Sequence, residues 1–165
     1  MNEHPAPSPS AILTRGIAVA AAVGVALLVG ADVIAKGQAA GHVRYHALIA
    51  LVVLAIAAVL ARRQGDSWRP MAPSIGLGFL AFAQLVEAVG GAGFDAANET
   101  RNGLAVIHDL GIGLTGLGLV AMILGIAVGI WDALARRGIP SRIAVGGGVA
   151  ILVLGGFAVK MLIGF

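Results

Sequence analysis

The stretch Gly103–Arg137, GLAVIHDLGIGLTGLGLVAMILGIAVGIWDALARR, decides how the chain folds. It has no charged side chain from Leu110 to Trp131, which is long enough for a helix to cross the hydrocarbon core of a bilayer. Two ionisable residues, His108 and Asp109, stand immediately before this apolar run. The stretch therefore predicts a transmembrane helix with a polar entrance at its N-terminal end.

The composition of the whole chain agrees with a membrane setting. Of its 165 residues, 59% are hydrophobic and 12% are charged, whereas a soluble domain of this size carries about 25% charge. There is no cysteine, which excludes disulfides and thiolate metal sites. The net charge of +3 comes from basic residues near predicted helix ends, so it indicates membrane topology and does not indicate nucleic-acid binding.

Apolar runs separated by polar loops predict an all-α, polytopic membrane protein with a four-helix bundle and a C-terminal fifth helix. Residues 1–10, with three prolines, are predicted to be a disordered tail, and residues 11–165 a single transmembrane domain. An alternative for the first span is a cleaved signal peptide. A Gly-containing loop is expected from Lys36 to His42. The five spans are expected at about 11–35, 43–61, 74–94, 104–135 and 143–165.

The basic residues predict the orientation in the membrane. The loops after the second and fourth spans are rich in arginine, and basic loops stay on the cytoplasmic side. The N-terminus is then inside and the C-terminus outside, in a cytoplasmic or inner membrane. Trp68 and Trp131 fall at the inner interface, where aromatic anchors are common.

A weak internal repeat relates the first two spans to the third and fourth. HALIAL, beginning at His46, aligns with HDLGIGL, beginning at His108. Glycine and alanine are frequent here, so chance similarity is the alternative. A true repeat would place the two histidines at equivalent depths, as in membrane folds built from repeats.

The ionisable residues inside the spans gather on one side of the membrane. His42, His46, Glu87, His108 and Asp109 all belong to the outer half or its edge, and Asp32 and Asp95 lie near helix ends. Such residues usually face the interior of a bundle and mark a functional site. We therefore expect something polar or charged to be handled near the outer face.

A bis-histidine haem b site is one interpretation of this cluster, because it requires two imidazoles from different helices at matching depth. His46 and His108 are the first pair, and Gly111 leaves room on the face of His108. Counting residues to the inner helix ends makes His42 a better match than His46 to the depth of His108. Either His42 or His46 therefore remains a candidate partner of His108. A divalent metal site, or histidines that are merely interfacial, are the alternatives, and close helix packing would also explain the glycines.

Glu87 is a lone carboxyl within the third span, where an isolated charge would be prohibitive. It is a candidate proton relay beside a redox centre, or the coupling site of a transporter. The structural alternative is a protonated Glu87 that is hydrogen-bonded to Gln84 or to a histidine.

The layout of spans and histidines resembles a small membrane cytochrome b and is similar to one four-helix half of haem A synthase. The resemblance covers about Ala11 to Arg137 and implies haem ligands at His46 and His108. Haem A synthase has a glutamate on its first helix, which this chain lacks, and the fifth span has no counterpart there.

Three functions follow as expectations. The first is a haem b-binding electron-transfer subunit that works with a quinone or a redox partner. The alternatives are a non-catalytic subunit or scaffold, and a small proton- or metal-coupled transporter that uses Glu87. The glycine-rich helix faces also suit an oligomer. Whether the chain is an enzyme stays open.

Overall fold

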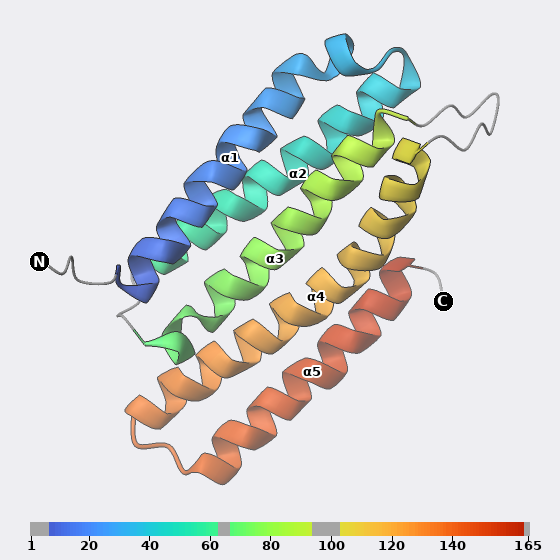
Figure 1. The fold of residues 1–165 in the computed structure, drawn as a ribbon. Helices are drawn as coiled ribbons and strands as arrows, with labels where there is room; N and C mark the ends of the chain where they lie inside the picture. Colours follow the sequence, from blue (N-terminus) through green and yellow to red (C-terminus); the bar gives the residue numbers. More distant parts are fainter. Residues whose placement is uncertain (1–6, 63–66, 94–102, 164–165) are drawn as a thin grey trace, which may run out of the picture.

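The computed structural model describes residues 7–62, 67–93 and 103–163, and these fold into helices with no strand among them (Figure 1). The predicted all-α class is confirmed. Successive helices run in alternating directions and lie side by side. They are α1 (Pro9–Ile34), α2 (Gln38–Ala61), α3 (Trp68–Gly91), α4 (Gly103–Arg136) and α5 (Ser141–Ile163).

Helices α1 to α4 are each long and apolar enough to cross a membrane. This confirms the expected membrane-compatible helical chain. In α5 the apolar stretch identified within the described residues, Ser141–Phe157, is shorter than the other four. The fifth transmembrane span therefore stays a prediction.

The beginnings of the first two helices differ from the prediction. α1 begins at Pro9, because the Ser8 side chain caps it by accepting from the Ala11 backbone N–H at 3.3 Å, and proline suits the first turn. The predicted tail of residues 1–10 is thus too long, and residues 1–6 lie outside the described ranges. The expected loop from Lys36 to His42 is also wrong. Gly37 turns the chain with a positive φ of 57°, and α2 starts at Gln38.

The start of α3 was predicted too late. It begins at Trp68, six residues before the predicted start at residue 74. The prolines that suggested a loop lie near its start, where backbone N–H groups have few intrahelical partners. Pro70 occupies the first turn, and Pro73 lies inside the helix with its ring against Gly129 of α4.

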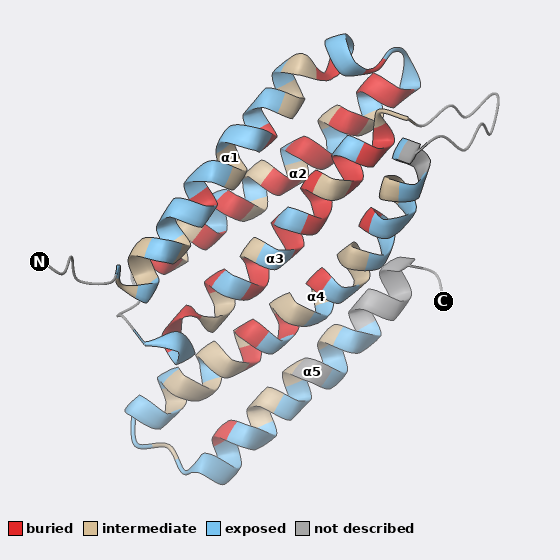
Figure 2. Cartoon of the chain, in the orientation of Figure 1, coloured by how far each residue is buried: buried red, intermediate tan, exposed pale blue. Residues whose placement is uncertain are grey.

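α3 lies at the centre of the packing. It contacts α1, α2 and α4, and it carries more buried residues than its neighbours (Figure 2). In the described residues, no Cα of α2 comes within 8 Å of a Cα of α4, and α5 packs against α4 alone. The bundle is therefore open, with α1 and α2 on one side of α3 and α4 and α5 on the other.

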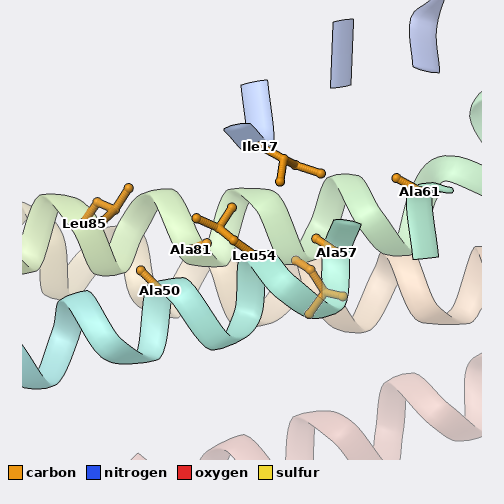
Figure 3. Close-up of a cluster of buried hydrophobic side chains, with 8 residues drawn as sticks. Ile17, Ala50, Leu54, Ala57, Ala61, Ala81 and Leu85 are labelled. Atoms are coloured by element: carbon orange, nitrogen blue, oxygen red, sulfur yellow. The ribbon is translucent and has the colours of Figure 1, made fainter. Parts of the chain in front are cut away.

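Alanines and larger aliphatic side chains together form the contact between the first three helices. One buried cluster joins Ile17 of α1 to α2 and α3 (Figure 3). Alanines allow the helix backbones to approach closely, which favours association within a membrane. The other members of the cluster are Ala50, Leu54, Ala57, Ala61, Leu77, Ala81 and Leu85.

Glycines form the contact between α3 and α4. A Cβ added at Gly111 would lie 2.7 Å from the Cα of Glu87, and one at Gly118 would lie 2.8 Å from the Cα of Leu80. A Cβ at Gly90 would collide with the backbone of His108. These approaches support the packing interpretation of the glycines, and they bring Glu87 close to the helix that carries His108.

The opposite end of the bundle carries aromatic and basic side chains. The Arg69 guanidinium lies 5.8 Å from the ring centroid of Trp68 and 4.9 Å from that of Trp131. Both are cation–π distances. Asp132 pairs with Arg136 one turn later, at 2.7 Å. Both tryptophans thus lie at the same end of the molecule, as the orientation argument expected.

Candidate metal centre

Polar side chains from three helices meet near the other end of the bundle. α2 supplies two histidines, α3 a glutamine and a glutamate, and α4 a histidine and a threonine. His46, Gln84 and Glu87 are buried, and the others are partly buried. The residues are His42, His46, Gln84, Glu87, His108 and Thr115.

The two histidines of α2 lie together because residues four apart share a helix face. The ring centroids of His42 and His46 are 4.4 Å apart. The His42 ring also lies 4.9 Å from that of His108, and their Nε2 atoms are 3.1 Å apart. Of the two partners left open for His108, the structure places His42 against it.

The two carboxylate oxygens of Glu87 have different neighbours: one accepts hydrogen bonds, and the other faces a histidine. The Thr115 hydroxyl donates to Glu87 Oε2 at 2.9 Å, and the Gln84 amide donates to Thr115 Oγ1 at 2.8 Å. The same amide lies 3.5 Å from Glu87 Oε2. The other carboxylate oxygen, Oε1, lies 3.4 Å from His46 Nε2. Glu87 therefore has one oxygen held by α4 and one directed at a histidine.

Three of these residues can offer ligand atoms to one ion. A nitrogen from His42, a nitrogen from His108 and a carboxylate oxygen from Glu87 all lie within 4.8 Å of one another. Imidazole and carboxylate are the ligand types of His₂Glu zinc sites. The carboxylate is buried, and a buried carboxylate is stable when a cation or hydrogen bonds compensate its charge. This group therefore has the chemistry of a divalent transition-metal site.

The direct contact between His42 and His108 leaves no space for a haem iron between these two rings as they are placed. Two axial nitrogens, each about 2 Å from the iron, would lie about 4 Å apart on opposite faces of the porphyrin. The His42 and His108 nitrogens are 3.1 Å apart and in direct contact. Gly111, expected to leave room for a porphyrin, packs against Glu87 instead. The haem b assignment, whose first pair is His46 and His108, stays a prediction from the sequence.

The remaining acidic residues of the outer half lie at the edge of the cluster or beyond it. Asp109 is exposed, and its Oδ1 is 4.0 Å from His108 Nδ1, too far for a hydrogen bond. Asp32 is paired with Arg44 on the exposed surface. Asp95 lies outside the described residues.

The importance of Thr115 and the position of Gln84 were only partly visible in the sequence. Gln84 stands three residues before Glu87, so a shared helix face was expected. Thr115 stands seven residues after His108, two turns along the same face of α4. Its polarity in an otherwise apolar run was the signal that could have identified it.

Comparison with known proteins finds no matching family, no similar curated protein and no matching solved structure.

Proposed function

We propose that this chain is an integral membrane protein that binds a divalent transition-metal ion, with Zn²⁺ as the best fit, near its outer face. The observation that supports this proposal is the convergence of His42, Glu87 and His108 from three helices. In tetrahedral zinc sites, with metal–nitrogen distances of about 2.0 Å, neighbouring ligand atoms are about 3.3 Å apart. The 3.1 Å between the His42 and His108 nitrogens is close to that value.

The ligand types favour this class of ion over others. Imidazole suits zinc, copper, nickel and iron, whereas magnesium and calcium prefer sites made entirely of oxygen. In the described residues, the group offers two nitrogens and one carboxylate. We therefore expect Zn²⁺ to bind far more tightly than Mg²⁺ or Ca²⁺.

Purified protein in detergent is expected to bind one Zn²⁺ per chain. His42→Ala and His108→Ala should each weaken the affinity at least about tenfold, because each removes a ligand. Binding should also weaken as the pH falls, since a protonated imidazole has no lone pair for the metal. Isothermal titration calorimetry and elemental analysis measure affinity and stoichiometry.

Asp32→Asn is the control for this measurement, because Asp32 is an exposed carboxylate paired with Arg44. Unchanged affinity in both histidine variants would contradict the proposed site. An α-band at about 560 nm in the reduced-minus-oxidised spectrum would instead support the haem b, electron-transfer function expected from the sequence. Proteoliposome flux of Zn²⁺ separates a transporter from a scaffold that holds the ion.

We further propose five membrane crossings, with the N-terminus inside and the C-terminus outside. The loops between helices carry the charge asymmetry that supports this orientation. The chain has no cysteine, so single cysteines report topology without background. In intact cells, a membrane-impermeant maleimide should label Lys36→Cys and Phe165→Cys, and should label Arg137→Cys only after lysis.

The C-terminal position tests the fifth crossing separately. Labelling of Phe165→Cys only after lysis, with Lys36→Cys labelled in intact cells, would mean that four helices cross and α5 stays at the inner face. Labelling of Arg137→Cys in intact cells would reverse the proposed orientation.

A further inference from the structure

Two pairs of atoms in the polar cluster have the spacing of tetrahedron edges. The Nε2 atoms of His42 and His108 are 3.1 Å apart, and His46 Nε2 is 3.4 Å from Glu87 Oε1. The two pairs share no atom. In a tetrahedral zinc site, each edge between ligand atoms measures about 3.3 Å. His46 is not one of the three residues whose ligand atoms all lie within 4.8 Å of one another, but its ring lies beside that of His42 and its Nε2 faces Glu87, so it is the neighbouring imidazole from which a fourth ligand would come.

The hydrogen bond of His46 on its other side directs the required nitrogen towards Glu87. Gln84 Oε1 lies 2.8 Å from His46 Nδ1 and, as a carbonyl oxygen, accepts a hydrogen bond from it. The Gln84 amide nitrogen donates to Thr115 Oγ1 at 2.8 Å, which agrees with this orientation of the amide. Nδ1 therefore carries a proton. In a neutral ring, which a metal ligand requires, the lone pair is then on Nε2, the nitrogen that lies 3.4 Å from Glu87 Oε1. Metal-binding histidines are commonly oriented in this way.

The same network orients the carboxylate. Thr115 donates to Glu87 Oε2 at 2.9 Å, and Oε1 is the oxygen nearest His46. His46 Nε2 and Glu87 Oε1 face each other at 3.4 Å in a buried site, where either a shared proton or a bound metal ion compensates the charge of the carboxylate.

Resting on the proposed function, we infer that His46 is a fourth ligand and that the centre is a closed, tetrahedral His₃Glu site. Gln84 and Thr115 act as positioning residues: the first directs Nε2 of His46, and the second holds one oxygen of Glu87 so that the other faces the ion. Four protein ligands leave no position for a reactive water. The centre is therefore built to hold its ion.

Cobalt substitution tests the coordination directly. Co²⁺ in a four-coordinate tetrahedral site gives intense visible bands, whereas five- or six-coordinate Co²⁺ absorbs weakly. The wild-type protein titrated with Co²⁺ should show intense bands. In His46→Leu the bands should weaken and shift, and Zn²⁺ affinity should fall at least about tenfold. Tyr45→Phe is the matched control, because Tyr45 is the exposed residue next to His46 in the sequence. This variant should have the cobalt spectrum and the zinc affinity of the wild type.

The positioning residues give a second, independent measurement. Thr115→Val and Gln84→Leu should each lower Zn²⁺ affinity about 10- to 100-fold, the usual effect of removing a hydrogen-bond partner of a ligand. Thr115→Ser keeps the hydroxyl and should restore the affinity. Circular dichroism verifies that each variant keeps its helices.

The outcomes separate this inference from the proposed function. If the wild type binds neither Zn²⁺ nor Co²⁺, the proposed function fails. If it binds both, but His46→Leu keeps the wild-type cobalt spectrum and zinc affinity, the ion has three protein ligands and the inference is overturned. Equal affinity of Thr115→Val and Thr115→Ser would overturn the positioning role.

Discussion

Glu87→Gln is expected to lower Zn²⁺ affinity at least about 100-fold while the helices stay folded. Glu87 supplies the single carboxylate of the three-ligand group. Glutamine has nearly the same shape, and its amide oxygen still accepts from the Thr115 hydroxyl, so packing between α3 and α4 is preserved. The lost negative charge removes the main attraction for a divalent cation. Calorimetric titration of the purified variant measures the change.

Thermal unfolding with and without Zn²⁺ provides an independent measurement of the same variant. A ligand at 100 times its dissociation constant adds about 2.7 kcal/mol to the free energy of unfolding. The wild type should gain this stability under such conditions, and Glu87→Gln should gain almost none. Without metal the variant should still fold, because glutamine has nearly the same shape and keeps the hydrogen bond from Thr115. A variant that still gains the wild-type increment from zinc would refute the role of Glu87.

Gly111→Ala is expected to destabilise the protein by about 2 kcal/mol and to weaken metal binding. The added Cβ would lie 2.7 Å from the Cα of Glu87, so α3 and α4 must move apart. This movement displaces Glu87 relative to His108, and the ligand group opens. Unfolding in a graded series of denaturing detergent, followed by circular dichroism, measures the change in stability.

Gly113→Ala is the matched control on the same helix. Nothing lies within 4 Å of a Cβ added at Gly113, and alanine favours a helix over glycine by about 0.5–1 kcal/mol. We therefore expect this variant to be as stable as the wild type or slightly more so. If Gly111→Ala and Gly113→Ala changed the stability equally, the close approach of α3 and α4 at Gly111 would have no specific role in stability.

The amino-acid sequence predicted the helical, membrane-compatible architecture because long uncharged apolar runs leave few alternatives in a bilayer. It predicted helix starts less well. The prolines near Trp68 resemble loop residues, yet the first turn of a helix tolerates them. The turn at Gly37 is shorter than the polar composition around it suggested. Composition describes a segment, whereas a boundary depends on single backbone groups.

The site was predicted as a polar region before its geometry was known. The gathering of ionisable residues in one half of the spans identified the residues, and counting along the helices favoured His42 opposite His108. The close approach of α3 and α4 depends on which glycines face each other. That register arises from the packing of whole helices, and no single segment of sequence specifies it. The contact between Thr115 and Glu87 follows from this register.

Because α2 and α4 are separated, an ion in this centre would act as a cross-link between helices. In the described residues, the backbones of these helices do not come within 8 Å of each other, although His42 and His108 touch. An ion held by both histidines and by Glu87 would cross-link three helices at one end of an open bundle, much as a disulfide joins distant segments. Such an ion would tie α2 to α4, two helices whose described backbones make no direct contact, while α4 stays packed on α3 through its glycines.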